Sequence, residues 1–233
     1  MTRIRFQQNL DELKEQLLVM AGLAEQSIQR AIEAYRVRDL SICDLVSRSE
    51  LAINRLERDI DQAALDLLAM EQPMAIDLRF ILSVIKINAD LERVGDSAKG
   101  ISDRVRVMDQ MAAVDLPVDI PRMAALAADM VRRSLQAFID GDAELARHVL
   151  TMDDAVDAMN KAAYRALTKV MEEQSQIAPQ ALNALMISRA LERVADHATN
   201  IAEDVIFWVQ GDDVRHHKSV KAGKEEKEPK AGA

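Results

Sequence analysis

The chain has 233 residues and a formal net charge of −9, and 49% of its residues are hydrophobic while 30% are charged. This composition suits a globular protein with a real core, and the acidic balance argues against a general nucleic-acid binder, which needs basic patches to displace counterions from phosphates. With only 7 Gly and 5 Pro, the chain favours helix interiors over turns, which predicts an all-α fold.

Three long helices are predicted in the first half of the chain. Apolar residues recur at helical spacing over residues 4–38 and again over 42–67. The pattern breaks at 70–73, because a proline pushes the preceding residue out of the α region and fits best near a helix start. A third helix is predicted at 74–108.

The stretch AAVDLPVDIPR, with two prolines, follows and predicts an internal linker. Beyond it three more helices are expected, with breaks at Gly141 and at Ala178-Pro179; their ranges are 121–140, 142–173 and 180–210. We therefore expect a first bundle at 1–113, a linker at 114–121, a second bundle at 122–211 and a disordered tail at 212–233. The tail alternates Lys with Glu and has too few large apolar residues to offset its ordering entropy.

The two halves repeat each other. LERVGDSA begins at Leu91 and LERVADHA at Leu191, an offset of 191 − 91 = 100. Asp39 matches Asp142 at an offset of 142 − 39 = 103, so the second unit is three residues shorter between its second and third helices. This pattern predicts two tandem three-helix bundles made of six long antiparallel helices.

Pairs of acids four residues apart are the most unusual feature of the repeats. On a helix such residues share one face. The pairs are Glu57 with Asp61, Glu92 with Asp96, and Glu192 with Asp196. If Leu91 is placed at 0°, the apolar seam of its helix centres near 330° while the acids, including Asp103, fall at about 100 to 140°. The carboxylates are therefore expected to face outward, and Glu203 repeats the placement of Asp103.

Two interpretations of these acidic faces stay open. One is a solvated surface neutralised by nearby arginines. The other is a cation site, because like charges at i and i+4 repel each other and a bound cation removes that repulsion. Carboxylate oxygens suit Mg, Mn, Fe or Zn. His197, next to Asp196, is either a nitrogen ligand or a solvated surface histidine.

Other chemistry finds little support in the sequence. A carboxylate-bridged di-iron bundle needs Glu-x-x-His, whereas Glu192 and His197 are five apart. The chain has no Gly-rich phosphate loop, no Cys-x-x-Cys and no nucleophile elbow. A binding module is therefore favoured over an enzyme. The single Cys43, the lack of a long apolar run and the polar start of the chain lead us to expect a cytoplasmic protein without a transmembrane segment.

Two segments resemble the signatures of a known family. QPMAIDLRFILSVIKINADLERVGDSAKGI, at 72–101, resembles the signature of the PhoU family of phosphate-signalling proteins, and ALERVADHATNIAEDVIFWVQGDDVRH, at 190–216, is similar to the family's C-terminal signature. The resemblance implies a cytoplasmic regulator without enzymatic activity. It would couple the phosphate-specific ABC transporter, through the ATPase subunit, to a sensor histidine kinase, and would keep the phosphate-starvation (Pho regulon) response off when phosphate is plentiful.

The resemblance also implies a homodimer and surface metal clusters. Carried over by residue, the metal candidates are Glu57, Asp61, Glu92, Asp96, Glu192 and Asp196, with Asp103, Asp153, Asp157 and Glu203 as possible additions. By the offset of 103, Glu57 and Asp61 return as Asn160 and Tyr164, which supply no carboxylate. Asp153 and Asp157 lie earlier on that helix and are the possible substitutes. We therefore expect the first half to hold metal more completely than the second.

Four further residues are candidates for partner binding: Asp77, Arg79, Phe207 and Trp208. For Asp77 and Arg79 the alternative is helix capping with an intramolecular ion pair. For the two aromatic residues the alternative, which we favour, is closure of the end of the second bundle. The alternative function is a metal-storage or metal-dependent phosphate-handling protein.

Overall fold

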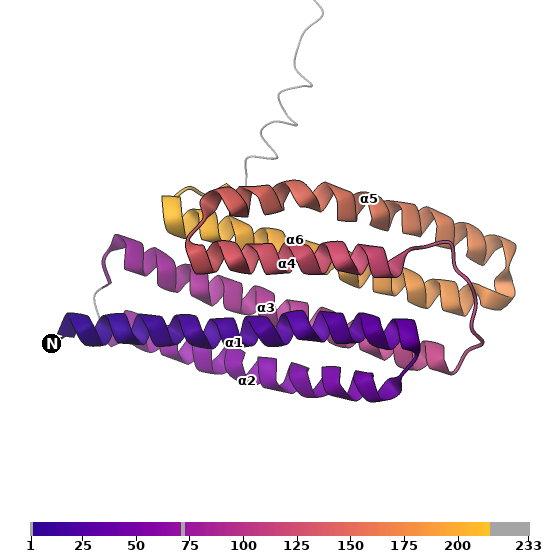
Figure 1. The fold of residues 1–233 in the computed structure, drawn as a ribbon, viewed down its shortest axis with the longest axis horizontal. Coiled ribbons are helices and arrows are strands. Elements are labelled where there is room, and N and C mark those ends of the chain that lie inside the picture. Colours follow the sequence, from indigo (N-terminus) through magenta and orange to yellow (C-terminus); the bar gives the residue numbers. More distant parts are fainter. Residues whose placement is uncertain (1, 71–72, 215–233) are drawn as a thin grey trace, which may run out of the picture.

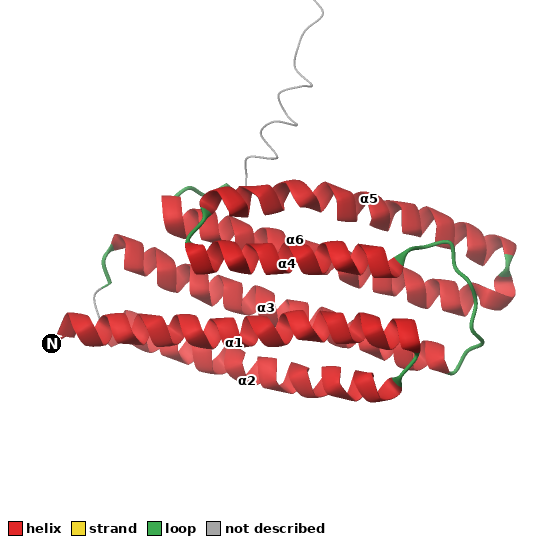
Figure 2. Cartoon of the chain, viewed as in Figure 1, coloured by secondary structure: helices red, strands yellow, loops and turns green. Residues whose placement is uncertain are grey.

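The structure is a computed structural model that describes residues 2–70 and 73–214. Figure 2 shows that this part of the chain is built of helices joined by loops, with no strand. The six long helices are α1 (Thr2–Val37), α2 (Leu40–Met70), α3 (Ala75–Asp109), α4 (Ile120–Asp140), α5 (Ala143–Glu173) and α6 (Ala178–Gln210). The all-α prediction is confirmed. Most of the tail expected to be disordered, residues 215–233, lies outside the described residues.

The helices form two antiparallel three-helix bundles that lie side by side along their length (Figure 1). Helices α3 and α6 make the main contact between the bundles, as extensive as the contact of α5 with α6, whereas α1 and α4 touch less. The largest of three apolar clusters among the described residues draws on all six helices and includes buried Leu17, Ile60, Ile87, Phe138 and Leu191. The bundles therefore share this cluster.

Matching turns at the ends of α1 and α4 preserve the repeat in the backbone. Gly141 ends α4 in the left-handed region with φ 62°, and Arg38 follows α1 with φ 55°. Each next residue is an aspartate that caps the following helix: Asp39 accepts a hydrogen bond from the Ser41 amide, and Asp142 accepts from two amides of α5. Side-chain oxygens at this position satisfy amides that have no partner within the helix.

One predicted break was misplaced. Helix α6 begins at Ala178, and Pro179 lies in its first turn, where a missing amide hydrogen costs nothing. The chain instead bends at Gln174, followed by a short 3₁₀ helix at Ser175–Ile177. No helix in the described ranges is both long and apolar enough to cross a membrane.

Candidate metal-binding faces

The first acidic face is formed by Glu57 and Asp61 of α2 together with Glu92 and Asp96 of α3. Asp96 is exposed and the other three are half-buried, so all four lie on the outside of the core, as expected. Burial raises the pKa of Glu92 above its usual value, and the negative charges of Asp96 and Glu57 raise it further. Three carboxylates from two helices therefore lie close enough to repel one another.

Asp61 is the least available member of this face. Its carboxylate accepts a hydrogen bond of 2.9 Å from Nδ2 of buried Asn88, which also donates to the backbone carbonyl of Glu57 at 2.9 Å. The i, i+4 spacing places Asp61 beside Glu57, but Asn88 holds one oxygen of Asp61. About one turn closer to the start of α2, Asn54 donates a hydrogen bond of 2.6 Å to the Glu50 side chain.

The second acidic face combines Asp153 and Asp157 of α5 with Glu192 and Asp196 of α6. Burial raises the pKa of Glu192, and the charges of Asp196 and Asp157 raise it further. Burial, then the charges of Asp153 and Asp157, likewise raises the pKa of Asp196. Asp157 also forms an ion pair with Lys161 at 3.2 Å. Four mutually repelling acids therefore gather here.

Asp153 and Asp157 thus take the place of the missing pair in the second half. Asn160 accepts a hydrogen bond from Ser188 at 2.9 Å, and Tyr164 is exposed. Each face thus has four carboxylates, with Asp61 engaged by Asn88 on the first and Asp157 by Lys161 on the second. The order in which the two halves hold metal stays a prediction.

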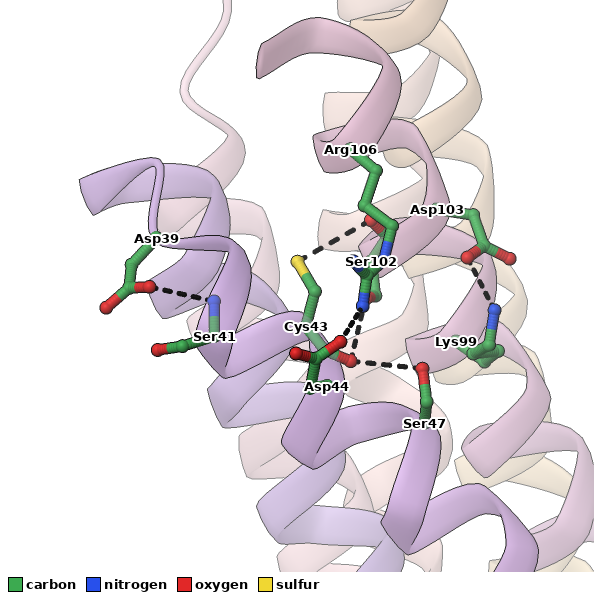
Figure 3. A network of polar contacts seen from close by, with 9 residues as sticks. All are labelled: Asp39, Ser41, Cys43, Asp44, Ser47, Lys99, Ser102, Asp103 and Arg106. Carbon is green, nitrogen blue, oxygen red and sulfur yellow. Dashed lines mark hydrogen bonds and ion pairs between the residues drawn. The ribbon is translucent and has the colours of Figure 1, made fainter.

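Asp103 and Glu203 have other neighbours. Figure 3 shows Lys99 donating to Asp103 one turn away on α3, and Arg106 reaching across to Asp44 on α2. Glu203 lines a groove between α3 and α6. Cys43 in the same view is buried, and its Sγ lies 3.7 Å from the carbonyl of Ser102.

The donor set of both faces fits a cation that prefers oxygen. The raised pKa values of Glu92, Glu192 and Asp196 reflect burial and repulsion between carboxylates, and a bound cation would relieve the repulsion. Within the described ranges no three Asp, Glu, His or Cys side chains already converge in a coordinating arrangement. Binding would therefore require these carboxylates to turn toward the ion.

His197 is not a surface residue, and that alternative was wrong. It is 8% exposed, and its Nδ1 lies 2.9 Å from Oδ1 of buried Asp90 across the contact of α3 with α6. Asn200 also donates to Asp90, at 3.2 Å. The sequence interpretation missed this polar contact between the bundles, although Asp90 directly precedes the core residue Leu91.

A second polar contact joins the same two helices. Asp204 is 4% exposed and accepts from Lys86 Nζ at 3.1 Å, and Ser83 donates to the backbone carbonyl of Asp204 at 2.9 Å. The Lys86 ammonium also lies 5.0 Å from the centre of the Phe207 ring. Phe207 is half-buried and contacts the first bundle through Lys86.

The other candidates for partner binding also make contacts within the chain. Arg79 Nε donates to the carbonyl of Trp208 at 3.1 Å, which satisfies the end of α6. The Trp208 ring packs against Phe80 at 5.1 Å and against Phe138 at 5.4 Å between ring centres. These contacts match closure of the bundle end. Asp77 lies half-buried in the first turn of α3.

Both halves of the chain match one family model. Residues 17–105 and 120–205 match the PhoU domain. The "Phosphate-specific transport system accessory protein PhoU homolog" of Pseudomonas aeruginosa is 37% identical over 213 residues, covering 91% of this chain and 88% of the relative. The similarly named protein of Clostridium acetobutylicum is 31% identical over 215 residues, covering 92% and 98%.

Solved structures agree with these matches. The crystal structure of PhoU from Pseudomonas aeruginosa is similar with a TM-score of 0.86 at 35% identity, covering 89% of this chain and 100% of that one. The phosphate transport system regulatory protein PhoU from Streptococcus pneumoniae gives a TM-score of 0.82 at 29% identity, covering 90% and 99%.

Proposed function

Because this chain belongs to the PhoU family, with the family's domain present twice, we propose that it is a cytoplasmic, non-enzymatic negative regulator of phosphate uptake and of the phosphate-starvation response. It acts by protein contact, coupling the ATPase subunit of a phosphate-specific ABC transporter to a sensor histidine kinase. The observation that carries the proposal is the match along nearly the whole chain to accessory proteins of phosphate-specific transport.

Each acidic face binds a metal ion in this proposal. Glu57, Asp61, Glu92 and Asp96 hold the first ion, and Asp153, Asp157, Glu192 and Asp196 hold the second. Carboxylate oxygens select a hard or borderline cation such as Mg, Mn, Fe or Zn. The ion supplies positive charge to a surface on which carboxylates repel one another, and it lets that surface approach an acidic partner.

The partner surfaces are expected on the outer sides of the bundles rather than at the aromatic bundle end. Trp208 and Arg79 already contact each other and the core, so changing them would disturb folding together with any interface. The acidic faces carry exposed Asp96 and Asp196, whose replacement leaves the core untouched. The active species in this proposal is a homodimer.

Deletion of the gene, followed by measurement of an alkaline-phosphatase reporter in high phosphate, tests the regulatory role. The reporter should be switched on in the deletion strain and off again when the wild-type chain is restored. Tagged protein should also retain the transporter ATPase or the kinase in a pull-down. A reporter that stays off in the deletion strain would refute the regulatory role.

Elemental analysis of purified protein tests the metal proposal separately. Glu92→Gln and Glu192→Gln should each lower the bound metal. Glu12→Gln, on the exposed side of α1, is the matched control. Full metal content in both variants would reject the sites. Metal binding without retention of either partner would instead support the alternative, a metal-storage or metal-dependent phosphate-handling protein.

A further inference from the structure

The first bundle has a cavity lined by the ends of α1 and α3 and by the connection to α4. Figure 1 shows these two helix ends and the connection at the same end of the molecule. The volume of the cavity is about 330 Å³, and we call it the linker cavity. Tyr35, Arg36 and Arg38 contribute its basic and phenolic side, and Asp109 and Asp115 its acidic side. The rest of the wall is apolar and comes from the end of α3 and from the connection.

The equivalent corner of the second bundle is filled. Tyr35 corresponds to Phe138 by the offset of 103, and Met108 corresponds to Trp208 by the offset of 100. Phe138 stacks on Phe80 of the neighbouring bundle at 5.8 Å between ring centres, and Trp208 meets Phe80 edge-on at 5.1 Å. Three aromatic rings therefore close the second corner, where the first corner has a phenol, a thioether and a cavity.

The third aromatic ring has a polar counterpart as well. Phe80 corresponds to Gln180 by the offset of 100. Gln180 is 6% exposed, and its Nε2 donates to the carbonyl of Ala112 in the connection at 3.3 Å. Its Oε1 is buried without a hydrogen-bond partner in the described part of the chain. Each of the three aromatic residues that close the second corner therefore corresponds, at the first corner, to a residue that is less aromatic or more polar.

Arg38 differs from the residue at the equivalent position of the second repeat. It adopts φ 55° where its counterpart Gly141 adopts φ 62°, and both backbone amides donate to the carbonyl four residues earlier. Glycine takes this conformation without steric cost, whereas a side chain is strained in it. The first repeat therefore keeps a guanidinium at a position where the backbone favours glycine.

Arg38 lines the linker cavity, and within the described residues most donors of its guanidinium make no hydrogen bond to the chain. Nη1 makes one long hydrogen bond, 3.3 Å, to the carbonyl of Met111, and a guanidinium carries five donors in all. Arg36, by contrast, is held by a two-point ion pair with Glu33 at 2.8 and 2.9 Å. Arg38 is accordingly the cation best placed to bind an anion.

We propose that the linker cavity binds a nucleoside monophosphate, with Arg38 holding the phosphate and the apolar wall covering the base. A guanidinium matches phosphate geometry. Asp109 and Asp115 are placed to accept hydrogen bonds from sugar hydroxyls or an amino group. Because Arg36 is already paired with Glu33, Arg38 is the one cation of the lining that is free to meet a phosphate, which disfavours a polyphosphate. The volume lies near the lower end for organic ligands.

This inference goes beyond the proposed regulatory role and does not depend on it. The connection between the two bundles forms part of the cavity wall. A ligand bound there would favour one placement of the connection, and so couple the concentration of a small metabolite to the relation between the bundles. Binding is measured on the purified chain, so its failure leaves the role in phosphate signalling unaffected.

Isothermal titration calorimetry with AMP, GMP, CMP and UMP tests the proposal, with adenosine, inorganic phosphate and ATP as comparison probes. At least one monophosphate should bind more tightly than each comparison probe. Arg38→Gly should weaken it by about tenfold or more, because a charged hydrogen bond is lost. That variant should fold at least as stably as wild type, because it restores the glycine of the other repeat.

Two more variants complete the design. Met108→Trp copies the sealing residue of the second corner and should abolish binding while preserving the helical circular-dichroism spectrum. Arg132→Gln removes an exposed arginine of α4 and should leave binding unchanged. The proposal is overturned if no monophosphate binds at about 1 mM, if Arg38→Gly binds as well as wild type, or if inorganic phosphate or ATP binds most tightly.

Discussion

Gly95 packs against Ile53 where α3 contacts α2, and the second repeat has different residues at both positions. This difference gives a quantitative test of the packing. A Cβ added at Gly95 would lie 2.8 Å from Cδ1 of Ile53 and 3.4 Å from its Cγ2. By the repeat offsets, the corresponding pair is Ala195 and Val156. Valine lacks the Cδ1 methyl, so the second repeat has gained a methyl on one helix and lost one on the other.

The expected energies follow from these two methyl groups. Gly95→Ala gains about 1 kcal/mol of helix propensity but overpacks a fully buried site, which costs about 1 to 3 kcal/mol. Its net effect should be a destabilisation of roughly 0 to 2 kcal/mol. Ile53→Val alone should cost about 1 kcal/mol. The double variant should show neither of these losses, because the methyl added at residue 95 fills the space left by the methyl removed at residue 53. The coupling energy between the two changes should therefore reach about 1 to 3 kcal/mol.

Urea unfolding followed by far-ultraviolet circular dichroism measures all four proteins of this cycle. The double variant should be as stable as wild type or more stable. The converse exchange in the second repeat, Ala195→Gly with Val156→Ile, is the matched control and should show coupling of the same sign. If the two single changes add within about 0.5 kcal/mol, the contact between Gly95 and Ile53 does not constrain the packing of α2 on α3.

Three other predictions concern charge, turn geometry and the contact between the bundles. In chelator-treated protein, Glu192→Gln should raise Tm at neutral pH and leave it unchanged near pH 3. The reason is that the pKa of Glu192 is raised in the folded state, so its charge destabilises the fold only at pH values where Glu192 is ionised in the unfolded chain. Gly141→Ala should cost about 1 kcal/mol in urea unfolding, since an added Cβ has room but the left-handed backbone is strained. Asp90→Ala should lower the free energy of unfolding by about 3 kcal/mol because it leaves buried His197 without its partner. Ala190→Ser, at the equivalent position of the second repeat, should change stability little. A loss under about 1 kcal/mol for Asp90→Ala would show that the buried pair contributes little.

The periodic apolar pattern was sufficient to predict the six helices, because each helix buries one continuous stripe. Ile53, Ile60 and Leu67, for example, are all buried along α2. The position of a break was harder to predict from proline alone. A proline is compatible both with a turn and with the first turn of a helix, and at Pro179 the second possibility holds.

The sequence predicts which acids share a face of one helix, but not which residues of the neighbouring helix they meet. The i, i+4 rule joins residues within one helix, whereas the partners across two antiparallel helices depend on their register. Asn88 meets Asp61 in the first repeat and Ser188 meets Asn160 in the second, contacts that no spacing within one helix reveals. The buried pair of Asp90 and His197 lacks any signal in the repeat, because their counterparts are Ala190 and Ser97.

That asymmetry bears on how the two halves recognise each other. A second copy of the first half, docked in place of α4 to α6, would bring a serine opposite Asp90 where the native contact has an imidazole. Two copies of the second half would in turn leave His197 facing an alanine. If the chain were cut at its connection and the fragments mixed, unlike fragments should associate in preference to like ones, so the duplication has become a complementary pair that is no longer interchangeable.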